Sequence, residues 1–384
     1  MPTIAPLRIH FPGRLVFGNG CLDQLAGEVL QLAPSRIFIV TITPLLATLR
    51  GSIGQWEEKG VEVQVYTGIV QEPSFDDFHR IMQQAAPFSP DIILGIGGGS
   101  VLDIAKLVAA QIGNEQSLGD YIGIGLLKGR KAKLVCLPAT SGTGSEVSPN
   151  AILVDNMDNQ KKGIISPFLV PDIVYVDPLL TLSVPPAITA ATGLDALTHC
   201  LEAYTNKYAQ PLIDLYALEG IRLIAANLVR AVRHGDDAHA RSQVAMGSLL
   251  GGFCLGPVNT AAVHALSYPL GSSFHLPHGL SNALLLPYVM EFNLSAAPVR
   301  YADVAVALGC SREEDDLATA SKGVERVRAL IHECGIPATL KEAGIPENAI
   351  PDMAVAALKI TRLLNNNPRT VTLDDAIDLY KAAY

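Results

Sequence analysis

The stretch DIILGIGGGSVLDIAKLVAA, residues 91–110, joins a strand-type pattern directly to a helix-type pattern. It opens with an apolar run typical of a buried strand and closes with apolar residues at helical spacing. Between the two patterns lie the small residues Gly97, Gly98, Gly99 and Ser100. Glycines let backbone N–H groups approach a pyrophosphate closely, and a helix N-terminus adds favourable partial charge. The stretch therefore predicts a strand–turn–helix unit whose turn is a candidate phosphate site.

The alternative is a tight turn that binds no ligand, because lone Gly-rich turns are common. The stretch also departs from the G-x-G-x-x-G fingerprint, since Ser100 stands at the position of the third glycine. It lies late in its half of the chain, whereas the fingerprint belongs to a first turn. A standard Rossmann geometry is therefore not expected.

The chain on either side of this unit falls into two halves with different periodicity. Up to about residue 185, short β-type runs such as RIFIV (36–40), VEVQVY (61–66) and KLVCLPAT (133–140) alternate with helical patterns such as FDDFHRIMQQAA. Beyond the proline-punctuated segment 177–193 the strand patterns nearly vanish. We expect an α/β nucleotide-binding domain with a mostly parallel sheet over 1–185 and an all-α domain over 186–384. A cleft between two such domains is the default ligand site.

The composition excludes several classes of function. The 384 residues include 28 basic and 37 acidic side chains, a formal charge of -9, so nucleic acid is not an expected partner. The N-terminal residues lack a signal-peptide pattern, and no apolar run approaches the roughly 20 residues that span a bilayer. We therefore expect a cytoplasmic protein without a membrane partner. The six cysteines form no C-x-x-C pair, which indicates reduced, mostly buried thiols.

A second loop of small residues, PATSGTGSEVSPNA (138–151), follows another predicted strand. The hydroxyl groups of Thr140, Ser141 and Thr143 suit hydrogen bonds to the nicotinamide ribose and to phosphate, although such loops are often plain turns. Two loops that follow two parallel strands lie at the same carboxyl edge of a sheet, where α/β proteins bind ligands. Together the two loops favour a dinucleotide site over two unrelated turns.

A candidate metal site comes from the helical half. In ITAATGLDALTHCLEAYT (188–205), Asp195 and His199 are four residues apart and share one helix face. Such a pair alone is more often a hydrogen-bonded couple than a metal site, but HALSYPLGSSFHLPHG (264–279) adds His264 and His278. One carboxylate and three imidazoles suit Fe(II), Zn(II) or a related ion, with a position left open for substrate. His275 is a spare imidazole, either a ligand or a neighbour of the site.

Four motifs, GIGGGSVLDIAK, PATSGTGSE, GLDALTHCLEAY and PHGLSNALLLPYVM, occur in this order over essentially the whole chain. They resemble the iron-containing (group III) alcohol dehydrogenases, the family of lactaldehyde:propanediol oxidoreductases and butanol dehydrogenases. The resemblance implies a dehydroquinate synthase-like fold with the active site between an α/β and a helical domain. It also implies a homodimer, with the segment RIHFPGRLVFGNG at the interface.

The resemblance further implies a function and the residues that carry it. The expected reaction transfers a hydride between NAD(P)(H) and a small alcohol, diol or hydroxy acid, with Fe(II) or Zn(II) polarising the substrate oxygen. The implied metal ligands are Asp195, His199, His264 and His278, of which His278 also counts as a catalytic residue. The implied cofactor-binding residues are Gly97, Gly98, Gly99, Ser100, Asp103, Thr140, Ser141, Thr143 and Lys162.

Two positions depart from the family pattern. Many members carry a second histidine four residues after the ligand, whereas this chain has Tyr268 there. We predict that Tyr268 is a catalytic residue that relays a proton, since the usual imidazole is missing. Members that favour NAD often carry an aspartate just after the second strand, where this chain has Ile42. We therefore predict weak discrimination between NAD and NADP.

Two other functions stay open from the sequence. A sugar-phosphate cyclase resembling dehydroquinate synthase would share the fold, the dinucleotide and the metal, but its substrate phosphate calls for clustered basic residues near the metal motifs. The basic residues between 188 and 290 all lie outside those motifs: Lys207, Arg222, Arg230, Arg233 and Arg241. A non-catalytic metal- or nucleotide-binding protein is the other alternative, although it would have no need for a full ligand set beside two phosphate loops.

Overall fold

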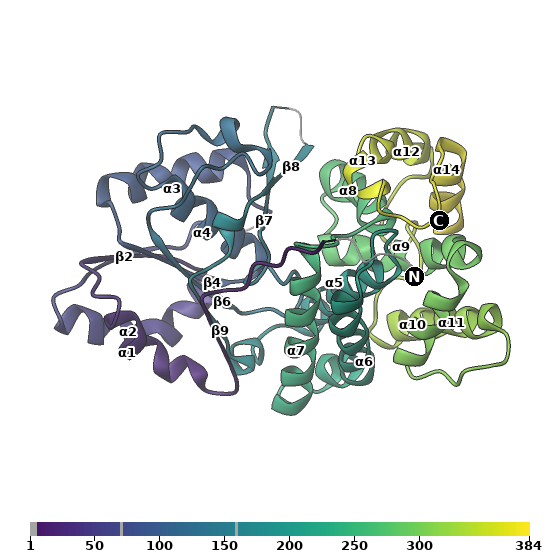
Figure 1. Cartoon of the computed structure of the whole chain (residues 1–384), viewed down its shortest axis with the longest axis horizontal. Coiled ribbons are helices and arrows are strands. Elements are labelled where there is room, and N and C mark those ends of the chain that lie inside the picture. Colours follow the sequence, from purple (N-terminus) through teal and green to yellow (C-terminus); the bar gives the residue numbers. More distant parts are fainter. Residues whose placement is uncertain (1–5, 70–71, 158–159) are drawn as a thin grey trace. The chain divides into compact units, whose positions relative to one another are not determined.

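The computed structural model describes residues 6–69, 72–157 and 160–384. The chain groups into two compact units, drawn in sequence colours in Figure 1. The first, here called the sheet unit, consists of residues 10–140 and 144–181. The second, the helical unit, consists of residues 6–9, 141–143 and 182–384.

The sheet unit is built on six parallel strands in the order β1-β9-β6-β4-β2-β3. The strands predicted at 36–40, 61–66, 91–97 and 133–140 are confirmed to within two residues. The bounds are β1 Arg14–Phe17, β2 Arg36–Val40, β3 Glu62–Tyr66, β4 Ile92–Gly97, β6 Lys133–Pro138 and β9 Ile173–Val176. The strands β2 and β4 read as continuous apolar runs because helices cover both faces of the sheet.

Two pairs of helices cover these faces (Figure 1). Phe38, Val40 and Ile93 pack with residues of α3 and α4, whereas Ile37 and Ile39 pack with residues of α1 and α2. The helices are α1 Leu25–Leu30, α2 Leu46–Glu58, α3 Phe75–Phe88 and α4 Gly99–Gln111. Alternate residues of one strand thus pack into two separate apolar cores, one on each face of the sheet.

The sheet unit also contains a small three-stranded sheet that the sequence pattern did not predict. Its strands are β5 Gly123–Ile124, β7 Asn150–Asp155 and β8 Gln160–Ile165. β7 and β8 pair antiparallel, and β8 begins with the polar run Gln-Lys-Lys. A strand with so little apolar alternation carries a weak sequence signal, which explains why it was missed.

The helical unit contains no strand between Leu182 and Tyr384, all of which the structure describes, so the predicted all-α character is confirmed. Its helices are α5 Pro186–Thr205, α6 Pro211–Arg233, α7 Ala238–Leu255, α8 Ala262–Phe274, α9 His278–Asn293, α10 Pro298–Ala307, α11 Asp316–Glu333, α12 Ile350–Leu358, α13 Thr361–Leu364 and α14 Leu373–Ala382. No helix among the described residues has the length and apolar character needed to cross a membrane. All six cysteines are free thiols, and all but Cys310 are buried.

Helix α5 lies in the centre of this unit, packed against α6, α7 and α9. Every residue of α5 from Gly193 to Thr205 is buried. Over this stretch the helix therefore has no exposed polar face, and its charged side chains lie in the protein interior. A buried charge is stable only when it is paired or hydrogen-bonded, so the neighbours of α5 must supply partners.

A buried ion cluster fixes α4 to the segment that follows β6. The Lys106 side chain is fully buried, and its Nζ donates to the carbonyl oxygens of Ser148 at 2.9 Å and Asn150 at 2.8 Å. Asp103 accepts hydrogen bonds from the Ser145 hydroxyl and the Ile152 amide. Burial lowers the pKa of Lys106 and raises that of Asp103, while their mutual attraction opposes both shifts. These contacts hold the helix that follows the Gly-rich turn against β7.

We predict that Lys106→Met lowers the free energy of unfolding by about 3 kcal/mol, because it leaves two buried carbonyls without their donor and removes the positive charge that attracts the buried Asp103 carboxylate. Chemical denaturation followed by circular dichroism measures this change. The matched control is Lys133→Met, since Lys133 is largely exposed and pairs with Asp172 at the surface; its expected cost is below about 1 kcal/mol. Equal effects of the two substitutions would contradict the buried role of Lys106.

Candidate metal and cofactor site

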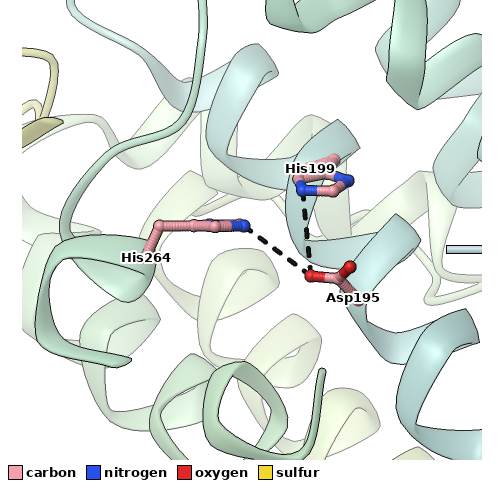
Figure 2. Close-up of side chains that lie close together, drawn as sticks. All are labelled: Asp195, His199 and His264. Atoms are coloured by element: carbon pink, nitrogen blue, oxygen red, sulfur yellow. Dashed lines mark ion pairs between the residues drawn. The ribbon is translucent and has the colours of Figure 1, made fainter. Parts of the chain in front are cut away.

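Two helices bring together the first three candidate metal ligands (Figure 2). Asp195 and His199 project from the same face of α5, and His264 comes from the first turn of α8. The Asp195 Oδ1 lies 3.7 Å from the Nε2 of His199 and 3.7 Å from the Nε2 of His264. The potential ligand atoms of the three residues all lie within 4.8 Å of one another, and all three side chains are buried.

The fourth candidate, His278, is the first residue of α9. Its Nε2 lies 3.7 Å from the same Asp195 oxygen, so the three predicted histidine ligands converge on one oxygen of the fourth ligand. A Cβ added to Gly279 would lie 2.2 Å from the Ala191 carbonyl oxygen and 3.2 Å from the Asp195 Cβ. Only a residue without a side chain lets α9 start this close to α5. This close approach places His278 beside Asp195.

The electrostatic environment of the four candidate ligands favours the ionised form of the Asp195 carboxylate. Burial alone would raise the pKa of Asp195, but the three surrounding histidines hold it well below its ordinary value. Burial lowers the pKa of His199. Burial would also lower the pKa of His264, but the carboxylates of Glu202 and Asp195 raise it to about 9. Asp195 therefore carries its negative charge at neutral pH, the form that binds a cation.

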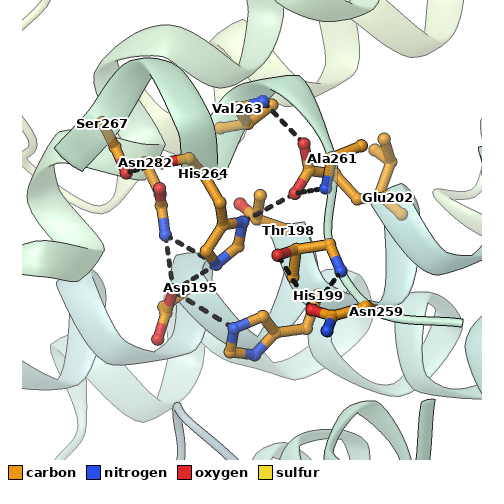
Figure 3. Close-up of polar contacts among 12 residues, drawn as sticks. Asp195, Thr198, His199, Glu202, Asn259, Ala261, Val263, His264, Ser267 and Asn282 are labelled. Atoms are coloured by element: carbon orange, nitrogen blue, oxygen red, sulfur yellow. Dashed lines mark hydrogen bonds and ion pairs between the residues drawn. The ribbon is translucent and has the colours of Figure 1, made fainter. Parts of the chain in front are cut away.

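Sequence analysis missed Glu202, a buried carboxylate on α5 (Figure 3). Its Oε2 accepts hydrogen bonds from the His264 Nδ1 at 2.6 Å and the Ala261 amide at 3.0 Å, and its Oε1 accepts one from the Val263 amide at 2.6 Å. In the neutral imidazole, the form that binds a metal, donation from Nδ1 leaves the lone pair on the His264 Nε2, which faces Asp195. Glu202 also satisfies amides at the start of α8. The sequence signal that could have identified Glu202 is its position on α5, three residues after His199 in a helix made mostly of apolar residues.

The donor set fits a divalent cation. One carboxylate oxygen and three imidazole nitrogens are typical ligands of Zn(II) and Fe(II). Bonds of about 2.1 Å in a tetrahedral site put ligand atoms roughly 3.4 Å apart. The observed 3.7 Å between the carboxylate oxygen and each imidazole nitrogen is close to this value.

Tyr268 and His275 differ in their relation to this cluster. The Tyr268 ring on α8 lies 6.3 Å from the His278 ring between centroids, so the phenol borders the candidate ligands. His275 ends α8 in a left-handed backbone conformation with φ 55°. Within residues 160–384, no hydrogen bond or ion pair is seen from His275 to the four candidate ligands.

The Gly-rich turn and the second loop start at one edge of the large sheet. β4 and β6 pair so that Gly97 lies beside Pro138, and the Ala139 amide donates to the Gly97 carbonyl at 2.8 Å. A Cβ on Gly97 would lie 2.8 Å from the Val101 side chain, so the glycine permits a close approach of strand and helix. The expected four-residue turn is shorter than predicted, because α4 already begins at Gly99.

The other predicted cofactor residues lie in different surroundings. A Cβ added to Gly98 would lie 3.4 Å from the Thr140 hydroxyl, so these two residues are neighbours. Ser141–Thr143 group with the helical unit, where a Cβ on Gly142 would lie 2.8 Å from the Cβ of Thr192. Lys162 lies on β8, with its Nζ 3.9 Å from an oxygen of Asp155.

Ile42 follows β2 at the carboxyl edge of the large sheet. Its side chain is half-buried and packs against the apolar cores on both faces. The preceding Thr41 is fully buried, and its hydroxyl oxygen has no hydrogen-bond partner among the described residues. The end of β2 therefore presents no carboxylate.

Comparison with known proteins matches the two halves of the chain to one family. Residues 12–178 match the model of the iron-containing alcohol dehydrogenases, and residues 189–384 match the C-terminal model of the same family. Long-chain-alcohol dehydrogenase 1 of Geobacillus thermodenitrificans is 39% identical over 98% of this chain and 96% of the relative.

Solved structures agree with this match. A crystal structure of a 1,3-propanediol oxidoreductase superposes with a TM-score of 0.95 at 32% identity, covering 99% of this chain and 100% of that one. A sulfoacetaldehyde reductase from Bifidobacterium kashiwanohense, solved in complex with NAD+, gives a TM-score of 0.87 at 26% identity, with 99% of each chain covered.

We predict that Glu202→Gln weakens metal binding by about 10- to 100-fold, the usual cost of losing a carboxylate that orients a ligating histidine. The new amide group can face the His264 Nδ1 with its own N–H, which favours the tautomer that lacks a lone pair on Nε2. Competition with a chromophoric chelator measures the affinity. Glu219→Gln, an exposed carboxylate on α6 paired with Arg222, is the control. If both variants keep the wild-type affinity, the orienting role of Glu202 is wrong.

Proposed function

The chain belongs to the iron-containing alcohol dehydrogenase family, and on that premise we propose that Asp195, His199, His264 and His278 hold one divalent cation, Fe(II) or Zn(II), at its active site. The enzyme is an NAD(P)-dependent alcohol dehydrogenase or aldehyde reductase that acts on small alcohols, diols or the corresponding aldehydes. One observation carries the proposed site: three imidazole nitrogens from α5, α8 and α9 lie at the same distance from one ionised, buried carboxylate oxygen. The sugar-phosphate cyclase alternative is not supported, because the relatives named above are dehydrogenases, reductases and oxidoreductases.

The chemistry divides between the bound groups and the chain. When bound, the cation supplies a Lewis acid for the substrate oxygen, and the nicotinamide supplies or accepts the hydride. Asp195 provides the negative charge that holds the cation, and Glu202 keeps the His264 lone pair directed at it. The Tyr268 hydroxyl, beside His278, relays the proton between the substrate oxygen and solvent. In this scheme no side chain has to act as a strong base.

We place the cofactor phosphates on the turn formed by Gly97, Gly98, Gly99 and Ser100, at the N-terminus of α4. The hydroxyl groups of Thr140, Ser141 and Thr143 bind the nicotinamide ribose and phosphate, and Lys162 lies near the ribose. Asp103 lies towards the nicotinamide end. It supports the second loop through its hydrogen bond with Ser145.

The cofactor preference is weak in this proposal. Ile42 carries no charge that could repel a ribose 2′-phosphate, and it carries no group that binds the ribose hydroxyls. Thr41, which precedes Ile42, is fully buried and carries no charge. Both NADH and NADPH are therefore expected to serve as substrates.

Two further proposals concern the organisation of the protein. The dinucleotide-binding domain spans 1–185 and the metal-binding and substrate domain spans 186–384. The protein forms a homodimer through its N-terminal segment. The edge position of β1 in the six-stranded sheet supports this proposal, because one side of an edge strand has no neighbour within its sheet.

We predict that metal-depleted protein does not oxidise NADH or NADPH in the presence of short-chain aldehydes, and that Fe(II) or Zn(II) restores turnover. His264→Ala and His278→Ala are expected to lose both metal content and activity while keeping their helical circular dichroism. Full turnover by metal-free protein would overturn the metal site.

A second prediction concerns the choice of cofactor. The values of kcat/KM for NADH and NADPH are expected to differ by less than about a hundredfold, which is roughly 2.7 kcal/mol. A larger preference for NAD would overturn the role given to Ile42.

A separate prediction concerns Tyr268. Removing the hydroxyl by Tyr268→Phe is expected to slow turnover by about 10²- to 10⁴-fold and to change the pH profile, as for other proton-transfer groups. Tyr288→Phe on α9 is a control that keeps the ring beneath Arg328. A Tyr268→Phe enzyme with the wild-type rate and pH profile would make Tyr268 a packing residue.

A further inference from the structure

A buried ring nitrogen of His199 is left without a hydrogen-bond partner. The His199 Nε2 lies 3.7 Å from the Asp195 Oδ1, and Figure 2 shows the other ring nitrogen pointing away from this carboxylate. That second nitrogen, Nδ1, is buried, and no atom of the described residues bonds to it in hydrogen-bond geometry. His264 differs, because its Nδ1 is bonded to Glu202 at 2.6 Å. The His199 imidazole therefore has one ring nitrogen whose partner has to be found.

The chemistry of a ligating imidazole determines what this partner must be. A neutral imidazole that binds a cation through Nε2, the nitrogen facing Asp195, carries its proton on Nδ1. Ligating histidines almost always donate this proton to a carboxylate, a backbone carbonyl or a water molecule, which fixes the orientation of the ring. A buried N–H group without an acceptor is costly. The segments packed around His199 must therefore offer an acceptor.

The second loop is one of these segments. Its residues 141–143 group with the helical unit, and a Cβ added to Gly142 would lie 2.8 Å from the Cβ and 3.2 Å from the Cα of Thr192. Thr192 precedes Asp195 by three residues and His199 by seven, so all three lie on one face of α5. Burial lowers the pKa of His199, whereas the Gly142 carbonyl opposes this shift as a hydrogen-bond acceptor beside the ring. The loop thus brings a backbone acceptor to this imidazole.

The same loop carries the residues to which the proposed function assigns the dinucleotide. Ser141 and Thr143, on either side of Gly142, offer hydroxyl groups for the nicotinamide ribose and phosphate. A dinucleotide held by both hydroxyls restrains the backbone between them, including the Gly142 carbonyl. A ligand that orders one partner of a contact lowers the entropic cost of forming that contact. Ordering of this loop is therefore useful to His199 as well as to the dinucleotide.

We propose that the Gly142 carbonyl accepts the Nδ1 proton of His199 when this imidazole binds a cation, so that dinucleotide binding and metal binding strengthen each other through the second loop. By thermodynamic linkage, each ligand raises the affinity for the other by the same factor, typically about 5- to 150-fold for such couplings. Gly142 is a positioning residue in this scheme, because it touches a ligand of the cation and not the cation. The inference rests on the proposed metal and dinucleotide sites and adds the coupling between them.

The experiment uses ADP-ribose, which has the pyrophosphate and both riboses of NAD but no nicotinamide ring. An effect of ADP-ribose on the metal therefore cannot come from contact between the ring and the cation. Zn(II) affinity is measured by chelator competition with and without saturating ADP-ribose, and ADP-ribose affinity is measured by calorimetry with and without Zn(II). Each ligand is expected to raise the affinity for the other at least about fivefold, and by equal factors.

A variant tests whether the coupling passes through Gly142. Gly142→Ala places a Cβ against Thr192, so the loop must move away from α5 and withdraw its carbonyl from His199. Loss of the partner of a ligating histidine is expected to lower the Zn(II) affinity of the ADP-ribose complex about 10- to 100-fold. The effect of ADP-ribose on Zn(II) affinity is expected to fall below about twofold. Gly129→Ala is the matched control, because a Cβ at Gly129 meets no atom within 4 Å; it is expected to behave as wild type.

A spectroscopic signal reports the hydrogen bond itself. In Zn(II)-loaded protein labelled with ¹⁵N-histidine, proton NMR is expected to show a ligand Nδ1–H resonance that exchanges with water more slowly when ADP-ribose is added. This change is expected to be absent from Gly142→Ala, whose fold is checked by circular dichroism. If Gly142→Ala does not fold, the reciprocal affinities and the NMR signal of the wild-type protein decide the matter.

Two outcomes would overturn the coupling while leaving both sites intact. One is a wild-type protein that binds Zn(II) and ADP-ribose independently of each other, and the other is a coupling of wild-type size in Gly142→Ala. The proposed function fails in a different way: a wild-type protein that binds no Zn(II) would refute the metal site, and one that binds no ADP-ribose would refute the dinucleotide site.

Discussion

The helical unit depends on the burial of one carboxylate, that of Asp195, in the stretch of α5 from Gly193 to Thr205, where every residue is buried. A lone buried anion would be unstable, so the surrounding elements must supply groups of the opposite character. They do so from three helices: His199 lies one turn further along α5, His264 comes from α8 and His278 from α9. The need to satisfy this charge and the ability to bind a cation are therefore the same property of the structure.

A second buried carboxylate on α5 extends this arrangement to the backbone. Glu202 binds amides at the start of α8 and the His264 side chain at once. The residue that secures the helix therefore also orients the imidazole on it. Metal affinity and the packing of α8 are coupled through Glu202, because a displacement of the helix start would change both sets of hydrogen bonds.

The sheet unit uses buried charge for a comparable purpose. Lys106 and Asp103 lie on α4 and bind main-chain groups around β7, together with the hydroxyl of Ser145. The hydrogen bonds of this pair hold the end of the second loop and the start of β7 against the helix that follows the Gly-rich turn. In both units, charged side chains on one central helix position the segments that we assign to ligand binding.

The sequence by itself determined the elements whose signal is local. The parallel strands and the helical second half follow from apolar periodicity, and the four candidate ligands and the two loops follow from short motifs. The tertiary structure alone decided which distant groups meet. Glu202 contacts a histidine 62 residues away, and Asn282 contacts an aspartate 87 residues away. The hairpin of β7 and β8 was missed because its polar strand is stabilised by its pairing rather than by a pattern of its own. Whether side chains on two helices can form a hydrogen bond depends on how closely the helices approach. Here Gly279 permits the close approach of α9 to α5. Such a distance has no counterpart in local periodicity, and therefore only the folded chain reveals it.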